Sequence, residues 1–205
     1  MSTIKRAAAL TGASIVGAAL WWRKKPSACP YNQRFWVQAP HPFITRGRLL
    51  TTLAPQAGER ILEIGPGTGY YTMDVARALL PGGTLDIFDL QQEMLDHTMQ
   101  EAEKAGLKNV VPQQGDAREL PYENESFDGV FLVTVLGEIP DRRLAWGEIH
   151  RVLKPSGRLV VGELFGDPHM VTLRRLRSEA GNAGLSFDSR TGPVFGFFAR
   201  FRRST

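Results

Sequence analysis

Cysteine is nearly absent from this sequence, since Cys29 is the only one among 205 residues. A lone cysteine excludes a disulfide within the chain and any zinc or iron–sulfur site built from several thiolates. It fits a reducing compartment. The sequence also shows no nucleophile–His–Asp arrangement and no metal-ligand spacing, so we expect no metal ion. The length suffices for one domain with a sizeable core.

Acidic residues are almost missing from the first 60 positions, which hold only Glu59 against nine Lys and Arg. This stretch therefore carries a formal charge of +8, whereas residues 61–205 hold 16 basic and 20 acidic side chains and carry −4. A nucleic-acid-binding protein would be expected to spread its basic residues over one face of the fold, whereas here they are confined to one terminal segment. We therefore expect no nucleic-acid partner.

One long uncharged run is present, AAALTGASIVGAALWW over residues 7–22, with basic residues on both sides. As a helix it would span roughly 24 Å, short of a hydrocarbon core of about 30 Å. Trp21 and Trp22 beside a basic run are typical of a membrane interface. We favour a retained membrane anchor. A helix lying on the membrane or on the protein surface and a cleaved signal peptide stay open as alternatives.

The chain is predicted to have three parts. Residues 1–25 form an N-terminal hydrophobic helix and candidate membrane anchor. Residues 26–54 form a proline-punctuated linker, an aromatic arm and a short amphipathic helix over 44–53. Residues 55–205 form the main domain, in which apolar runs alternate with helical stretches. This alternation predicts a mostly parallel sheet with helices on both faces. We expect strands near 60–64, 84–88, 109–113, 127–133, 157–163, 185–189 and 194–202, and helices near 69–80, 91–105, 141–152 and 169–183.

A glycine-rich turn, ILEIGPGTG over residues 61–69, follows the first predicted strand. In an open α/β sheet, ligands bind beyond the carboxyl ends of the strands. A dinucleotide-binding turn would place its third glycine at position 70, which is Tyr70 here. Glu63 is also out of place for a dinucleotide, but its carboxylate could bind the ammonium group of a cationic ligand. These features favour S-adenosylmethionine and disfavour a nicotinamide oxidoreductase.

Two further acids follow the second and third predicted strands. Asp89 could accept two ribose hydroxyls, and Asp116 could accept from an adenine amino group with Ala117 beside the ring. Leu90 and Met94 would supply apolar faces around adenine. Each acid also has a structural alternative. Glu63 could be a solvated strand-end acid, Asp89 a helix cap, and Asp116 an Asx-turn residue.

Four segments together resemble the class I S-adenosylmethionine-dependent methyltransferases in order and spacing. They are ILEIGPGTG (61–69), FDLQQEML (88–95), GDARELPYENESFDGVF (115–131) and RVLKPSGRLVVGE (151–163). The resemblance covers about residues 55–190 and fits best the methyltransferase type 11-like group acting on small molecules and lipids, including quinone C-methyltransferases and phospholipid N-methyltransferases.

The resemblance implies a Rossmann-like, doubly wound α/β fold with a seven-stranded, mostly parallel sheet and an antiparallel last strand. It implies S-adenosylmethionine as cofactor and S-adenosylhomocysteine as product, so residues 55–205 would be the methyltransferase domain. Thr134 is expected near the transferred methyl group or the methionine end of the cofactor. The resemblance implies cofactor contacts from Glu63, Gly65, Gly67, Asp89, Leu90, Asp116 and Ala117.

The acceptor side carries a departure from the family pattern, because Gly137 stands where relatives often have histidine. We expect this glycine to open space for a bulky acceptor. Glu138, His41 and Tyr31 are the catalytic candidates, and Glu138 could instead be a solvated helix-start residue. Methyl transfer from a sulfonium can proceed mainly by positioning, so the lack of an obvious base does not argue against an enzyme.

The sequence thus predicts S-adenosylmethionine-dependent methyl transfer, by in-line displacement, to a small hydrophobic or lipid-like acceptor. The +8 segment and the uncharged run predict membrane association, with the catalytic domain in the cytoplasm. A soluble cytoplasmic small-molecule methyltransferase and a non-catalytic S-adenosylmethionine-binding module are the alternatives. The sequence fixes no oligomeric state.

Overall fold

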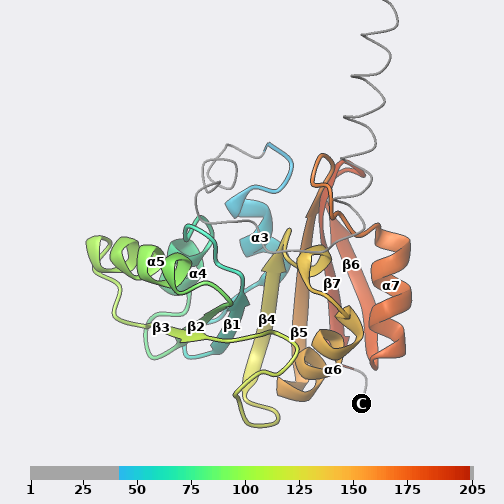
Figure 1. Cartoon of the computed structure of the whole chain (residues 1–205). Helices are drawn as coiled ribbons and strands as arrows, with labels where there is room; N and C mark the ends of the chain where they lie inside the picture. Colours follow the sequence, from blue (N-terminus) through green and yellow to red (C-terminus); the bar gives the residue numbers. More distant parts are fainter. Residues whose placement is uncertain (1–41, 204–205) are drawn as a thin grey trace, which may run out of the picture.

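Seven strands form one sheet in residues 42–203, the part of the chain that the computed structural model describes (Figure 1). The strand order is β3-β2-β1-β4-β5-β7-β6. All neighbours pair in parallel except β7, which runs antiparallel to both β5 and β6. The prediction of a Rossmann-like sheet with an antiparallel last strand is therefore confirmed. The strands are β1 (Arg60–Ile64), β2 (Thr84–Asp89), β3 (Val110–Gln114), β4 (Phe127–Val133), β5 (Leu153–Leu164), β6 (Leu185–Thr191) and β7 (Gly196–Arg203).

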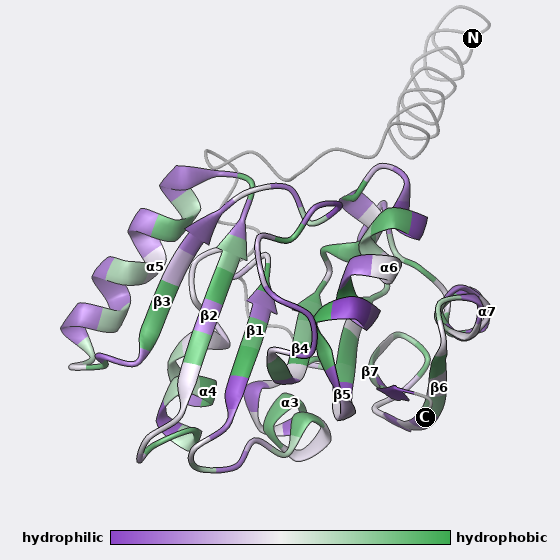
Figure 2. Ribbon diagram, turned by 90° about the horizontal axis from the view of Figure 1, so that it is seen from below, coloured by the Kyte–Doolittle hydropathy of each residue, from purple (hydrophilic) through white to green (hydrophobic). Residues whose placement is uncertain are grey.

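Helices cover both faces of this sheet, and each face has its own apolar core. On one face, α3 (Arg46–Leu53), α4 (Thr72–Ala78) and α5 (Gln92–Lys104) pack around residues such as Phe198. On the other, α6 (Arg142–Val152) and α7 (Leu173–Asn182) pack around residues such as Trp146. The middle of the sheet is apolar along β1 and β4 (Figure 2), as expected of strands that are buried on both faces.

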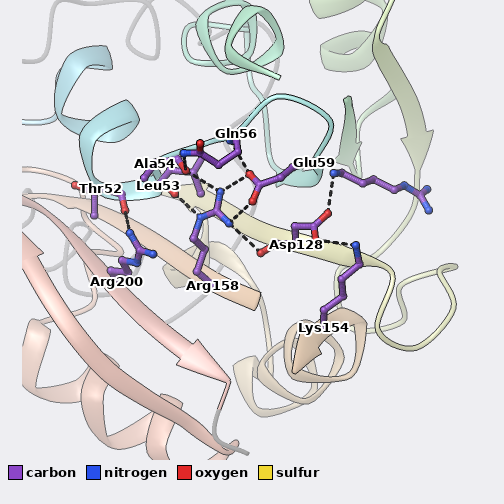
Figure 3. Close-up of polar contacts among 10 residues, drawn as sticks. Thr52, Leu53, Ala54, Gln56, Glu59, Asp128, Lys154, Arg158 and Arg200 are labelled. Carbon is purple, nitrogen blue, oxygen red and sulfur yellow. Dashed lines mark hydrogen bonds and ion pairs between the residues drawn. The ribbon is translucent and has the colours of Figure 1, made fainter. Parts of the chain in front are cut away.

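Arg158 fastens the end of α3 to the amino-terminal edge of the sheet (Figure 3). Its guanidinium donates to the backbone oxygens of Leu53 and Ala54, and it pairs with the Glu59 carboxylate at 2.5 Å. Carbonyls at a helix end have no partner within the helix, so Arg158 supplies one from the sheet. Helix α3 confirms the short helix predicted over 44–53 and shares the core of the main domain. The division of the chain at residues 54 and 55 stays a prediction.

The fifth strand was predicted near 157–163, but it begins earlier in the structure. The segment Lys154–Gly157 is part of β5, which begins at Leu153, and the pairing with β4 shifts register there. Phe127 pairs with Leu153 but Gly129 pairs with Arg158, so the extra residues bulge out between two paired stretches. The proline and glycine interrupt the ladder without ending the strand.

The predicted N-terminal hydrophobic helix, residues 1–25, lies outside the described residues, as do Tyr31 and His41. Between residues 42 and 203, no helix is long and apolar enough to cross a membrane.

Candidate functional site

A pocket of ≈ 370 Å³ opens at the carboxyl edge of the sheet, beyond the ends of β1, β2 and β4. Its wall comes from the loops that follow β1, β2, β3 and β4, together with the first turn of α5. Such loops meet at one edge because the four strands are parallel. Eight of the nine residues predicted to contact the cofactor line this pocket: Gly65, Gly67, Asp89, Leu90, Met94, Asp116, Ala117 and Thr134.

The loop after β1 needs glycine for two reasons at Gly65. Its φ of 72° lies in the left-handed region, and a Cβ built there would lie 3.0 Å from Cγ1 of Val135 and closer still to its Cγ2. The Gly65 N–H donates to the Phe88 carbonyl at 2.8 Å, which joins the loop to the end of β2. The loop therefore presents bare backbone to the pocket, so that a ligand can approach closely.

Asp89 ends β2 and lies on the pocket wall. One of its oxygens accepts from the Gln91 N–H at 2.9 Å, which is a local turn bond. Burial raises the pKa of Asp89 to about 6. The group is therefore mainly ionised at neutral pH and keeps acceptor capacity for ligand hydroxyls.

Asp116 lines the pocket, but Arg118 already engages its carboxylate. The Arg118 backbone N–H donates to Oδ1 at 2.9 Å, and its guanidinium donates to both oxygens at 2.6–3.0 Å. The hydrogen bonds from Arg118 hold the pKa of Asp116 below its usual value. The Asx-turn alternative is thus present, and an adenine contact from Asp116 stays a prediction. Arg118 also lines the pocket, although it was not predicted to do so. The only signal for it in the sequence is its position two residues after Asp116.

Glu63 lies beneath the pocket and is not part of its wall. Its side chain is 2% exposed, which excludes the solvated alternative, and Thr72 donates its hydroxyl to Oε2 at 2.6 Å. Burial, with a contribution from nearby Asp89, raises the pKa of Glu63 to about 8. Glu63 therefore carries a proton at neutral pH. Its contact with a ligand ammonium group stays a prediction, and no sequence pattern indicated its partner Thr72.

The acceptor side contains one clear error of the sequence interpretation. Gly137 does not leave room for a bulky acceptor, because a Cβ built there would overlap the His169 carbonyl oxygen and lie 2.7 Å from its carbonyl carbon. The loop after β5 fills that space. Glu138, the next residue, does line the pocket, and its catalytic role stays a prediction.

Thr134 holds a backbone conformation that is unusual for a residue with a Cβ. Its φ is 56°, its N–H donates to the Gly162 carbonyl at 2.8 Å, and its hydroxyl donates to the Val133 carbonyl at 2.7 Å. Such conformations are costly and cluster at functional sites. The strain therefore agrees with the predicted place of Thr134 at the reacting end of the pocket.

The pocket suits S-adenosylmethionine on the chemistry of its wall. It combines a strand-end carboxylate, a glycine loop with bare backbone, and apolar side chains from Phe88, Leu90 and Met94. Adenosine needs a hydrogen-bond acceptor for its ribose hydroxyls and an apolar surface for its base. In the described part of the chain, no group of three or more His, Cys, Asp or Glu could hold a metal ion.

A family model described as "Methyltransferase domain" matches residues 61–157, which include the loops around this pocket. Residues 61–157 are thus similar to a methyltransferase domain, in agreement with the predicted resemblance to the class I S-adenosylmethionine-dependent methyltransferases. A demethylmenaquinone methyltransferase of Staphylococcus aureus (strain JH9) is 34% identical over 117 residues, which are 57% of this chain and 48% of that protein. The same match is found in strain Newman. The chain thus spans about half the length of those relatives.

Solved structures share the fold of this chain. A SAM-dependent methyltransferase from Aquifex aeolicus aligns with a TM-score of 0.78 at 18% identity, over 86% of this chain and all of that one. The YcgJ protein from Bacillus subtilis aligns with a TM-score of 0.61 at 25% identity, over 71% of this chain and 70% of that one. The cyclase SpnF also aligns, with a TM-score of 0.69 at 19% identity, over 78% of this chain and 80% of that one. The fold alone therefore does not fix the reaction.

Proposed function

We propose that this chain transfers the methyl group of S-adenosylmethionine to a small hydrophobic or lipid-like acceptor. The observation that carries the proposal is the convergence of residues from four separate loops on one pocket wall. The acceptor class is supported by the relatives' name, demethylmenaquinone methyltransferase, and by the apolar lining of the pocket.

Bound S-adenosylmethionine supplies an electrophilic methyl group on a sulfonium. The chain's own residues bind and orient the two reactants. Asp89 accepts from ribose hydroxyls, the backbone at Gly65 and Gly67 allows close approach, and Leu90 and Met94 pack against the base. In-line displacement then depends on placing the acceptor atom opposite the sulfur.

The reacting end of the pocket lies between the loops after β1 and β4 in this proposal. Thr134, Glu138 and Ile139 form that part of the wall. A proton must leave only if the acceptor arrives protonated, and Glu138 is then the wall carboxylate placed to accept it. Glu138→Gln should slow methyl transfer to an acceptor that binds in its protonated form, and it should leave the affinity for S-adenosylmethionine unchanged.

We further propose that the enzyme works at a membrane surface with its catalytic domain in the cytoplasm. This rests on the uncharged run at residues 7–22 and on the net charge of +8 in residues 1–60. A membrane location would bring the pocket close to an acceptor dissolved in the bilayer.

The test uses methyl-labelled S-adenosylmethionine with the full-length protein, incubated separately with a lipid extract and with soluble metabolites. Label in the organic phase is the expected result. Label only in the aqueous fraction would favour the soluble small-molecule methyltransferase. Tight cofactor binding with label in neither fraction would favour the non-catalytic module. The control is Asp89→Ala, which should lose both binding and transfer.

A further inference from the structure

Four large apolar side chains are exposed together at one end of the sheet, and we call them the apolar patch. Phe165 is 69% exposed, Val194 66%, Phe195 58% and Phe43 39%. Single exposed apolar residues are ordinary, but contiguous ones mark interaction surfaces.

The members of the apolar patch come from three segments that meet. The Phe165 N–H donates to the Phe195 carbonyl at 2.7 Å, and the two rings are 5.9 Å apart, edge to face. Phe43, just before α3, packs on Gly196 so closely that a Cβ at Gly196 would overlap it. The patch is therefore one surface built from the loop after β5, the β6–β7 turn and the approach to α3.

Glycines with positive φ let both loops turn sharply beside the exposed rings. Gly166 follows Phe165 with a φ of 105°, and Gly192 opens the β6–β7 turn with a φ of 101°. A non-glycine residue would be strained at either position. The exposed position of these rings is thus a consequence of the local backbone and not of a frayed chain end.

The loop after β5 and the β6–β7 turn, which carry the patch, lie at the carboxyl edge of β5 (Figure 1). The cofactor pocket opens at the same edge of the sheet. Phe165 directly follows β5, whose parallel neighbour β4 leads into the pocket wall at Thr134. The loop that carries Phe165 also carries His169, which packs against Gly137 beside Glu138. A partner surface that bound the apolar patch would therefore lie next to the pocket.

Arg48 borders the patch, since it donates to the Phe43 backbone oxygen at 2.6 Å. Two exposed arginines belong to the segments that lead into the patch. Arg46, which pairs with Asp74 at 3.6 Å, follows Phe43 in the sequence, and Arg190 precedes the β6–β7 turn. The chain enters the described fold at the patch, and residues 1–41 carry six Lys or Arg and no acid. Apolar rings with cations around them complement an anionic lipid surface.

We propose that the apolar patch inserts into the headgroup boundary of an anionic bilayer, so that the pocket edge faces the lipid. This inference deepens the proposed function, since it states how a lipid-dissolved acceptor reaches the pocket. The docking proposal does not depend on the proposed methyl transfer, because docking uses residues outside the pocket wall.

The test places a polarity-sensitive fluorophore at one position of the full-length chain. In a Cys29→Ser background, Phe195→Cys carries the probe on the patch, and Val111→Cys carries it on an exposed apolar position of the opposite edge strand β3. Vesicles of phosphatidylcholine with phosphatidylserine are compared with phosphatidylcholine alone. We expect a blue shift at position 195 with the anionic vesicles and none at position 111.

Binding of unlabelled variants gives the second readout. Phe165→Ser together with Phe195→Ser should weaken vesicle binding by about tenfold or more, whereas Leu80→Ser with Val111→Ser should not. Vesicle binding without a shift at position 195 would overturn the proposal, because another segment would then hold the protein. A shift that grows with protein concentration in the absence of vesicles would overturn it in favour of a second copy of the chain.

The two proposals can fail separately. Calorimetry with S-adenosylmethionine should give the same affinity for the double serine variant as for the unmodified chain. Failure of docking with cofactor affinity intact would remove the patch and leave the methyltransferase proposal standing. Vesicle binding through the patch without any binding of S-adenosylmethionine would remove the methyltransferase proposal and leave the docking proposal standing.

Discussion

Glu63 links the stability of this fold to pH through a single buried carboxyl. Its pKa is raised from 4.5 to about 8 in the folded chain, so folding favours its protonated form. The stabilisation is complete below the unfolded pKa and is lost as pH rises from about 4.5 towards 8. Glu63→Gln, which keeps the size and cannot ionise, should reduce this loss by up to about 1.4 kcal/mol per pH unit.

Urea unfolding across that pH range measures the effect on the free energy of unfolding. The exposed Glu103→Gln on α5 is the matched control and should leave the pH dependence as it is. An identical slope for Glu63→Gln and the unmodified chain would contradict the assignment.

Asp89 makes a prediction about cofactor affinity at the same scale. Asp89→Asn should weaken S-adenosylmethionine binding roughly tenfold to a hundredfold, because hydrogen bonds to a charged acceptor are worth about 1.5–3 kcal/mol. Affinity in the unmodified chain should fall as pH drops through about 6, where Asp89 takes up a proton. Titration calorimetry measures both. Asp96→Asn, on the exposed face of α5, should change neither.

The short 3₁₀ turn Leu136–Glu138 and the loop after β5 act as one packed element. Gly137→Ala should lower the free energy of unfolding by about 1–3 kcal/mol, because the added methyl group overlaps the His169 backbone. Gly147→Ala in α6 has open space around it and should stabilise by about 0.5–1 kcal/mol instead. Equal stability of the two variants in urea unfolding would refute the close packing.

Helix α3 depends on Arg158 for its place against the sheet. Arg158→Lys removes the forked contact with Glu59 and cannot reach both α3 carbonyls at once. We expect faster amide hydrogen exchange over residues 46–53, with exchange in β1 and β4 little changed. Arg202→Lys, at an exposed ion pair on β7, is the control and should leave α3 protected. Unchanged exchange in α3 would show that apolar packing alone holds it.

At the scale of the whole molecule, the basic segment and the pocket residues belong to different parts of the sequence. Deleting residues 1–25 removes five of the nine Lys and Arg in the first 60 positions but no pocket residue. The truncated chain should shift from the membrane fraction towards the soluble fraction and keep its cofactor affinity. Sedimentation and calorimetry measure the two effects. A truncated chain that pellets as fully as the full-length chain would count against the anchor.

The sequence by itself determined the sheet and most of the pocket wall. Hydrophobic periodicity and the positions of glycine and proline are local signals. The seven strands and five helices of residues 42–203 could therefore be predicted from their own residues. The residues of the pocket wall could be predicted from the topology, because residues that follow neighbouring parallel strands meet at one edge of the sheet. Asp89 and Thr134 could be found this way although 45 positions separate them.

Only the tertiary structure decided what those residues touch. His169 against Gly137 and Arg158 against the end of α3 are contacts between segments far apart in the chain, and no local pattern encodes them. The burial of Glu63 that raises its pKa and the apolar patch around Phe165 arise in the same way. Burial is a property of how elements pack together, whereas a sequence states directly only which residues are neighbours along the chain.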